Sequence, residues 1–283
     1  MKFVPMSELL KRATSEAYAV PAFCVWNAET METVLRTAAT LKAPVILMSG
    51  PWEFSLLGPL DLGAVAHALI RRFEVPAALH LDHRNSLQQV EDCLAGGYTS
   101  VMLDYSIRPL AENTEAMKRV VAMAHPLGVT VEGELGIIGQ VDQVTPEGGG
   151  QAKLTDPDLA TSFVNETGID ALAVSIGNAH GIYTKLPQLD FERLTKIHAT
   201  VPVPLVLHGG SGTPEADLRQ AIMRGIAKVN VATESITAVR QSLMEQWGSG
   251  TNLWTPIALA GAMQAMAKVV EKWFHLTGAV GRA

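Results

Sequence analysis

Short runs of apolar residues recur along this chain, and the longer segments between them repeat apolar residues at every third or fourth position. A short continuous apolar run is typical of a parallel strand buried on both faces, and the longer spacing is typical of an amphipathic helix. The pattern predicts eight strands, at Ala19–Val25, Pro44–Ser49, Val75–Asp82, Ser100–Asp104, Thr130–Leu135, Ala171–Ile176, Leu205–His208 and Ala227–Val231. It predicts helices between them, among others at Glu29–Leu41, Ser86–Ala95, Pro109–His125, Asp156–Thr167, Phe191–His198 and Pro214–Arg224.

Eight strands that alternate with helices in a chain of 283 residues indicate a single-domain (β/α)8 barrel, the TIM barrel. A doubly wound parallel sheet is the alternative, but the regular spacing of the strands fits a closed barrel better. The stretch Gly136–Gln151 carries five glycines and one proline, which predicts a mobile loop. A last helix is expected near Pro256–Phe274, packed across the barrel or against a neighbouring subunit.

Composition narrows the class of protein. The formal net charge of −6 disfavours a general nucleic-acid binder, because such a protein is usually basic. The two cysteines, Cys24 and Cys93, form no disulfide framework or metal motif, so a reducing compartment is expected. The start of the chain lacks the apolar core of a signal peptide, and no stretch has the length of a membrane-spanning helix. These features predict a soluble cytoplasmic protein with no membrane partner.

Three histidines directly follow three of the predicted strands. His83 and His208 end apolar runs, and His180 comes shortly after another. Ligands of a parallel α/β barrel bind at the carboxyl ends of its strands, so these side chains are expected to share one face. One such histidine alone is more often structural, but three imidazoles together can hold a catalytic zinc ion with one position open.

Carboxylates gather at the same predicted face. Asp82 directly precedes His83, where it could act as a general acid or base, or could orient a histidine. Asp104 ends one strand, and Glu132 and Glu134 alternate along the next, so the two glutamates point to the same side. They could provide a second metal position or hold the histidines, or one of them could face the polar interior of the barrel.

Two further segments suggest a phosphate site. The stretch Gly209-Gly210-Ser211-Gly212 follows the seventh predicted strand, and Asn230-Val231-Ala232-Thr233 ends the eighth. These two loops commonly bind phosphate in this barrel, since glycines let backbone N–H groups approach an anion. Lys185 could add a positive charge, although a solvated loop lysine is the alternative.

Taken together, the motifs resemble the class II, zinc-dependent ketose-bisphosphate aldolases over nearly the whole chain. The matching segments are Leu81-Asp82-His83, Val101-Met102-Leu103-Asp104, Glu132-Gly133-Glu134-Leu135-Gly136, Ala179-His180-Gly181-Ile182-Tyr183, Leu207-His208-Gly209-Gly210-Ser211-Gly212 and Lys228-Val229-Asn230-Val231-Ala232-Thr233-Glu234.

The resemblance implies a role for each matching position. His83, His180 and His208 would bind one zinc ion per subunit, although such a site also suits cobalt and other metals. Asp82 would exchange a proton with the substrate hydroxyl that becomes the aldehyde oxygen, and Asn230 would contact the enediolate of dihydroxyacetone phosphate. Asp104 and Glu134 would form an alternative zinc position. The phosphate of the donor would be held by Gly181, Lys185, Gly209, Gly210, Ser211, Ala232 and Thr233.

The resemblance extends to cofactors and partners. It implies a phosphosugar substrate, a homodimer or homotetramer that is formed through the C-terminal helices from about residue 256, and a monovalent cation as a further cofactor.

The chain departs from the family pattern in one loop. Relatives often carry Gly-Gly-x-Glu-Asp there, and their glutamate moves a proton at the donor carbon, whereas this chain reads Ile138-Gly139-Gln140-Val141-Asp142-Gln143. Asp142 or Glu147 are the candidates to replace that glutamate. Arg84, after the metal histidine, and Asn27, after the first strand, are candidate contacts to the aldehyde acceptor. We therefore expect an atypical substrate, a ketose 1-phosphate or a sugar acid.

Three other functions remain as alternatives. A zinc hydrolase on this barrel usually has His-x-His after the first strand, which this chain lacks. A metal-free phosphosugar isomerase or epimerase would explain the phosphate loops but not the histidines. A degenerate, non-catalytic aldolase that binds phosphosugars is supported only by the altered loop.

Overall fold

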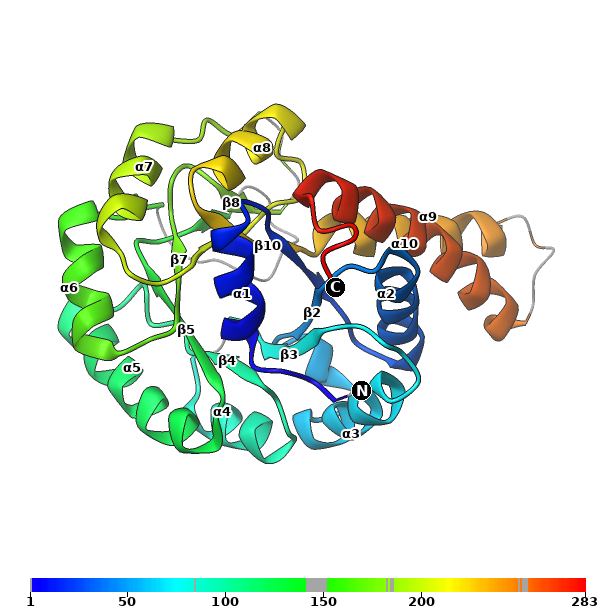
Figure 1. The fold of residues 1–283 in the computed structure, drawn as a ribbon. Helices are drawn as coiled ribbons and strands as arrows, with labels where there is room; N and C mark the ends of the chain where they lie inside the picture. Colours follow the sequence, from blue (N-terminus) through cyan, green and yellow to red (C-terminus); the bar gives the residue numbers. More distant parts are fainter. Residues whose placement is uncertain are drawn as a thin grey trace.

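The chain forms a closed barrel of eight parallel strands with helices around it, as a computed structural model shows for residues 2–83, 85–140, 152–181, 183, 186–248, 250 and 254–283 (Figure 1). The predicted (β/α)8 barrel is confirmed. Each strand pairs with its two neighbours in parallel register. The barrel strands are β1 (Val20–Cys24), β2 (Val45–Ser49), β3 (Ala77–Leu81), β4 (Ser100–Met102), β5 (Thr130–Leu135), β7 (Ala171–Val174), β9 (Leu205–Leu207) and β10 (Ile226–Val231).

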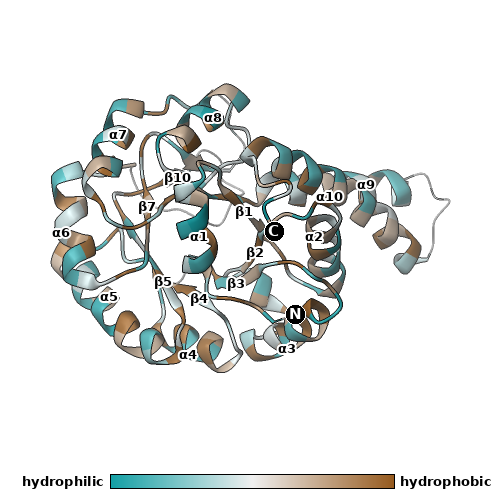
Figure 2. Cartoon of the chain, in the orientation of Figure 1, coloured by the Kyte–Doolittle hydropathy of each residue, from teal (hydrophilic) through white to brown (hydrophobic). Residues whose placement is uncertain are grey.

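The helices of the ring turn their apolar faces toward the strands. Figure 2 shows that these helices carry both hydrophobic and hydrophilic residues, as the amphipathic spacing predicts. The first turns of these helices are capped in ordinary ways. The side chain of Asp156, for example, accepts a hydrogen bond from the N–H group of Asp158, and a proline occupies the first turn of the same helix. The helices are α2 (Ala28–Leu41), α3 (Pro59–Ile70), α4 (Leu87–Ala95), α5 (Leu110–Ala124), α6 (Pro157–Thr167), α7 (Phe191–Thr200) and α8 (Glu215–Met223), with short 3-10 turns at Glu53–Ser55 and His125–Leu127.

A short helix closes the amino end of the barrel. Helix α1 (Met6–Ser15) crosses this opening in Figure 1 and packs against β1, β3 and β10. It buries Met6, Leu10 and Ala13 completely. The sequence analysis did not single out this helix, because it precedes the first strand rather than lying between two. The helix thus covers the amino end of the barrel, opposite the carboxyl ends of the strands.

Two long helices complete the chain. Helix α9 (Thr233–Gly248) and helix α10 (Thr255–Thr277) extend away from the barrel side by side (Figure 1). The last predicted helix is therefore present, and it packs along α2 and α9. Trp247 and Trp254, near the tip of this pair, are 49% and 71% exposed. That the pair lies at a subunit interface stays a prediction.

The stretch 136–151 is described only in part. Gly139–Gln140 forms a short strand, β6, which pairs in parallel with β8 (Ala179–His180), a strand that the apolar pattern did not predict. Residues 141–151, including Asp142 and Glu147, lie outside the described residues, so the predicted mobile loop stays a prediction. Among the helices that the structure describes, none is long and apolar enough to cross a membrane.

Candidate active site

The three predicted histidines meet at the carboxyl end of the barrel. His83 follows β3, His180 ends β8 and His208 follows β9. Nε2 of His83 lies 2.6 Å from Nδ1 of His208 and 3.1 Å from Nε2 of His180. The three side chains are buried, and His83 holds a backbone φ of +38°, a strained value for a non-glycine residue. Three ring nitrogens so close together repel one another unless a proton or a cation lies among them.

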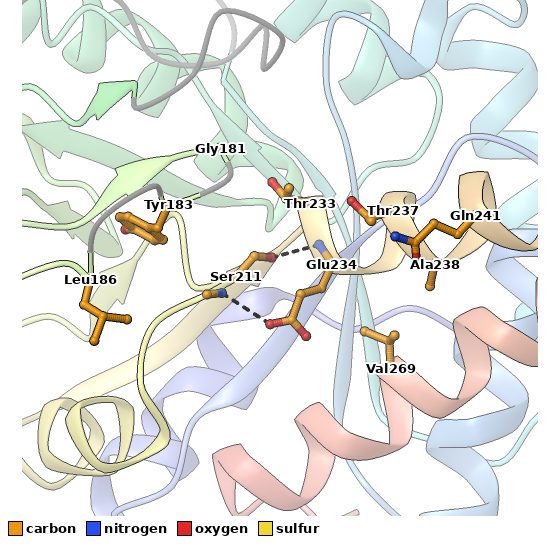
Figure 3. A pocket seen from close by; sticks show the side chains of 11 residues that line it. Gly181, Tyr183, Leu186, Ser211, Thr233, Glu234, Thr237, Ala238, Gln241 and Val269 are labelled. Carbon is orange, nitrogen blue, oxygen red and sulfur yellow. Dashed lines mark hydrogen bonds between the residues drawn. The ribbon is translucent and has the colours of Figure 1, made fainter.

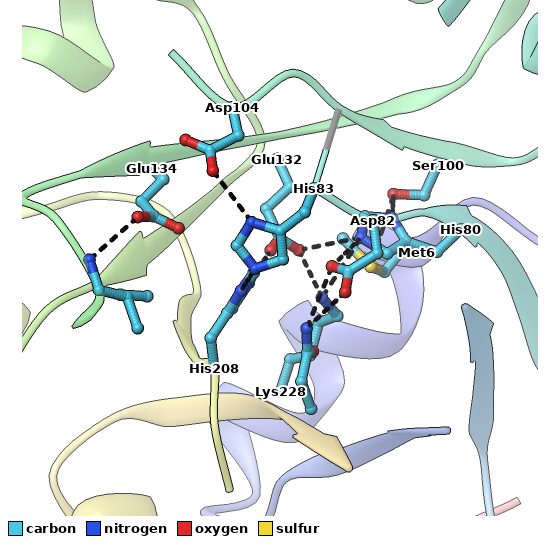
Figure 4. Close-up of polar contacts among 12 residues, drawn as sticks. Met6, His80, Asp82, His83, Ser100, Asp104, Glu132, Glu134, His208 and Lys228 are labelled. Carbon is cyan, nitrogen blue, oxygen red and sulfur yellow. Dashed lines mark hydrogen bonds and ion pairs between the residues drawn. The ribbon is translucent and has the colours of Figure 1, made fainter. Parts of the chain in front are cut away.

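The outer nitrogens of two of these rings are fixed by carboxylates. Nδ1 of His83 lies 3.0 Å from Oδ2 of Asp104, and Nε2 of His208 lies 2.7 Å from Oε1 of Glu132 (Figure 4). A carboxylate holds the proton of an imidazole on the nitrogen that faces it, so the other nitrogen presents its lone pair to the cluster. Nδ1 of His180 has no hydrogen-bond partner among the described residues.

This donor set fits a divalent metal ion. The ligand atoms of His83, His180 and His208 all lie within 4.8 Å of one another. Burial lowers the pKa of His83, but Asp82, Asp104 and Glu134 outweigh it and raise that pKa well above its usual value. The carboxylates thus favour a positive charge at this place, and a metal ion beside neutral rings would supply it.

Asp82 lies directly beside the cluster and is only 3% exposed. Burial alone would raise its pKa, but the neighbouring His83 and His80 lower it well below the usual range, so the group stays a carboxylate. Nδ2 of Asn230 donates a 3.1 Å hydrogen bond to Oδ1 of Asp82. Oδ1 of Asn230 is buried and has no partner within the described part of the chain. This oxygen can therefore accept a hydrogen bond from a hydroxyl group.

A layer of buried polar side chains lies beneath the histidines, and we call it the polar layer: His80, Ser100, Glu132 and Lys228 (Figure 4). Nζ of Lys228 donates to Oε2 of Glu132 at 2.8 Å and lies 3.4 Å from Nε2 of His80. Nδ1 of His80 lies 2.8 Å from the Ser100 hydroxyl, whose remaining contact is Sδ of Met6 on α1. The layer thus connects a histidine of the cluster to the helix that closes the barrel.

Sequence reasoning assigned no role to Lys228. Lys228 lies in β10, two residues before Asn230 and among apolar neighbours, and its side chain is fully buried. Period two along a strand places both side chains on the inner face. A lysine at such a position needs a partner, which is the signal that could have identified it.

Asp104 and Glu134 form a second acidic position with His83, and their ligand atoms also lie within 4.8 Å of one another. Burial, and then the nearby charge of Asp104, raise the pKa of Glu134 to about 8. Oε1 of Glu134 accepts from the Ile138 N–H group at 3.4 Å, and its Oε2 has no partner among the described residues. The structure thus brings together the two carboxylates that the sequence analysis placed there.

A small cavity opens between the histidines and the two predicted phosphate segments. It measures about 20 Å³, and it adjoins a larger pocket of about 410 Å³ that shares Gly181, Ser211 and Thr233 with it (Figure 3). The small cavity is lined by Met48, His180, Gly181, Gly209, Ser211, Asn230, Ala232 and Thr233. Helix α9 begins at Thr233, so the positive end of its dipole points toward this cavity.

The loop of residues 209–212, here called the glycine loop, passes close to neighbouring backbone. Gly209 has a φ of +64°, and a Cβ atom there would collide with the carbonyl group of Ala179. A Cβ atom on Gly210 would lie 2.8 Å from the Asn230 carbonyl oxygen. The Tyr183 hydroxyl lies 2.9 Å from the Ala179 carbonyl oxygen and 3.3 Å from the Gly209 carbonyl oxygen, so it links this loop to the strand of His180.

Several predicted site residues are not placed here. Lys185 and Arg84 lie outside the described residues. Asn27 is described, but its Oδ1 caps α2 by accepting from the Thr30 N–H group at 2.9 Å. The amide nitrogen of Asn27 takes no part in this cap and is the atom that would contact an aldehyde substrate.

Fold and site together define an aldolase barrel. Residues 4–282 match the family described as class-II fructose-bisphosphate aldolase. The chain belongs to this family, and it is therefore an enzyme of the aldolase type, a carbon–carbon lyase.

Three solved structures are similar to this chain in fold. The YdjI aldolase from Escherichia coli K12 is 34% identical over 99% of both chains, with a TM-score of 0.89. A putative fructose-1,6-biphosphate aldolase from Coccidioides immitis is 32% identical over 97% of this chain and 96% of that one, with a TM-score of 0.86. The fructose-bisphosphate aldolase of Campylobacter jejuni is 23% identical over 100% of this chain and 97% of that one, at a TM-score of 0.83, a likeness of fold.

Proposed function

We propose that the protein reversibly cleaves a phosphorylated ketose into dihydroxyacetone phosphate and an aldehyde, with one zinc ion held by His83, His180 and His208. The observation that carries this proposal is the convergence of three ring nitrogens, with carboxylates on the outer nitrogens of His83 and His208. Membership of the aldolase family supports aldol cleavage of a phosphosugar. Zinc, when bound, supplies a Lewis acid for the negative charge that develops on the donor carbonyl oxygen.

Asp82 is the proposed general acid and base. Its low pKa keeps it ionised, so in the cleavage direction it takes the proton of the hydroxyl that becomes the aldehyde oxygen. Asn230 orients this carboxylate through its Nδ2 and offers its buried Oδ1 to a hydroxyl of the donor. Because burial excludes water, both contacts act on the substrate with little competition.

The phosphate of the donor is proposed to lie beside the glycine loop, where the small cavity adjoins the larger pocket at Gly181, Ser211 and Thr233. Backbone N–H groups, the Ser211 hydroxyl and the start of α9 favour an anion there. The proposed contacts are Gly181, Lys185, Gly209, Gly210, Ser211, Ala232 and Thr233.

The aldehyde partner is proposed to be atypical, so that the substrate is a ketose 1-phosphate or a sugar acid. The altered loop after Gly139, Arg84 directly after the metal histidine in sequence, and the amide nitrogen of Asn27, which takes no part in the helix cap, support this. A substrate panel with turnover only on fructose or tagatose 1,6-bisphosphate would contradict it. We further propose a homodimer or homotetramer in the cytoplasm, with a monovalent cation as an additional cofactor.

The test of the reaction is isotope exchange. The purified, zinc-loaded protein is incubated with dihydroxyacetone phosphate in deuterated buffer, and exchange of the donor-carbon proton is followed with and without a chelator. We expect exchange that the chelator abolishes. Exchange that is absent, or that the chelator leaves unchanged, would contradict the proposal and favour a binding protein or a metal-free isomerase.

An Asp82→Asn variant separates the two half-reactions. Asp82 acts on the hydroxyl of the departing aldehyde, so the variant should keep its zinc and its donor-proton exchange but lose carbon–carbon cleavage by about a hundredfold or more. Unchanged cleavage in this variant would remove Asp82 from the mechanism.

A further inference from the structure

Glu234, in the first turn of α9, joins the glycine loop to the last helix of the chain. Its Oε1 accepts a hydrogen bond from the Gly212 N–H group at 3.2 Å (Figure 3). Its Oε2 accepts from Nε1 of Trp273 at 3.0 Å and from Nζ of Lys272 at 3.2 Å, both on α10. A single carboxylate therefore holds three segments that are far apart in the sequence.

The backbone of Glu234 also sets the direction of a hydroxyl group. Its N–H group donates to Oγ of Ser211 at 3.2 Å, and Ser211 lines the small cavity (Figure 3). A serine hydroxyl has one proton and two acceptor lone pairs. Because Oγ accepts a hydrogen bond from the Glu234 N–H group, the hydroxyl proton of Ser211 points in another direction. In the cavity, this proton can be donated to a ligand.

Trp273 supports the same loop from below. The indole is 1% exposed, and a Cβ atom on Gly210 would lie 3.4 Å from its Cη2 atom. The ring thus contacts the underside of the glycine loop while its N–H group anchors Glu234. Lys272 adds a positive charge that offsets the Glu234 carboxylate, which would otherwise repel a phosphoryl group nearby.

We propose that Glu234, Lys272 and Trp273, here called the clamp, are positioning residues of a phosphoryl subsite. They hold Gly212 and Ser211 in the arrangement that binds the anion, and they do not touch the reacting atoms. This inference rests on the proposed function, since it takes the glycine loop as the phosphate site. It assigns the C-terminal helix a role in substrate affinity: weakening the clamp raises KM for the phosphorylated ketose and leaves kcat nearly unchanged.

The test is the binding of inorganic phosphate, measured by calorimetry on metal-free protein so that phosphate cannot bind zinc. Glu234→Gln keeps the size of the side chain but loses the charge that pairs with Lys272, and Trp273→Phe removes the indole donor together with part of the ring that contacts the glycine loop. Each should weaken phosphate binding about tenfold, the effect of losing roughly one good hydrogen bond. Lys272→Met should act in the same direction and Lys272→Arg should restore binding.

The matched control is Glu271→Gln, which removes the same charge from an exposed position next to Lys272. It should bind phosphate within about twofold of wild type. The unfolding midpoint of every variant without phosphate checks that the fold is intact. Should Trp273→Phe lower that midpoint, the exposed Lys272→Met and Lys272→Arg pair carries the test.

The outcomes separate this inference from the proposed function. Folded variants that bind phosphate as tightly as wild type would overturn the clamp while leaving the phosphate site in place. Wild-type protein that binds neither inorganic phosphate nor dihydroxyacetone phosphate would overturn the phosphate site itself, and the clamp with it.

Discussion

The histidine cluster and the glycine loop lie next to each other at the carboxyl end of the barrel but are built from different parts of the chain. The cluster consists of side chains, two of which are held by charged partners, His83 by Asp104 and His208 by Glu132. The loop consists mainly of backbone, shaped by Gly209 and Gly210 and supported by Trp273. The cluster should lose its arrangement when one charged partner is removed, whereas the loop should lose its arrangement when a side chain is added. Variants can therefore test the two regions separately.

The largest effect is expected from His208→Ala. The change removes one of the three proposed metal ligands and leaves Glu132 facing a void, so zinc content should fall and kcat should drop by about a thousandfold. Metal analysis and turnover measure both effects. His275→Ala, at an exposed position on α10, serves as the control. Full zinc content and turnover in His208→Ala would remove His208 from the site.

Lys228→Met breaks the polar layer. The change leaves the Glu132 carboxylate buried without its cation, which should lower the free energy of unfolding by about 3 kcal/mol or more. Denaturant unfolding measures this difference. Lys268→Met, at an exposed position on α10, should change it by less than about 0.5 kcal/mol. Equal stability of the two variants would mean that the layer is not a coupled network.

Gly209→Ala adds a side chain to the glycine loop. The left-handed backbone and the collision with the Ala179 carbonyl group should together lower the free energy of unfolding by about 2 kcal/mol and weaken phosphate binding. Gly128→Ala is a matched control, because Gly128 has a φ of +70° but open space around it. It should lower stability by only about 1 kcal/mol. Equal effects at both positions would show that backbone strain alone, without the close approach, shapes the loop.

The last effect concerns Glu134 in metal-free protein. Its pKa of about 8 in the folded state lies above the ordinary value of 4.5, so the folded state binds an extra proton between these values. The resulting stability is present at low pH and is lost as the pH rises toward 8. Glu134→Gln should therefore flatten the dependence of the free energy of unfolding on pH between about pH 5 and about pH 8.

The control for this pH dependence is Glu112→Gln, at an exposed position on α5, which should leave the wild-type dependence in place. A Glu134→Gln protein with the same pH dependence as wild type would contradict the raised pKa.

The apolar pattern predicted the barrel and the face of its ligands because strand length, alternation and strand ends are local features. His83, His180 and His208 could be grouped since each follows a strand of one parallel barrel. Contacts across the barrel could not be predicted in this way. Lys228 meets Glu132 from strands that are not neighbours, and Trp273 meets Glu234 only once α10 has packed on α9. No local pattern fixes these distances.

The central claim is that one zinc ion on the three histidines makes this barrel an aldolase, and a zinc titration tests it most directly. Metal-free protein is titrated with zinc while bound metal and exchange of the dihydroxyacetone phosphate donor proton are followed together. We predict that exchange rises in proportion to zinc and levels off at one ion per chain. Exchange that is already complete without metal, or zinc that binds without restoring exchange, would contradict the account.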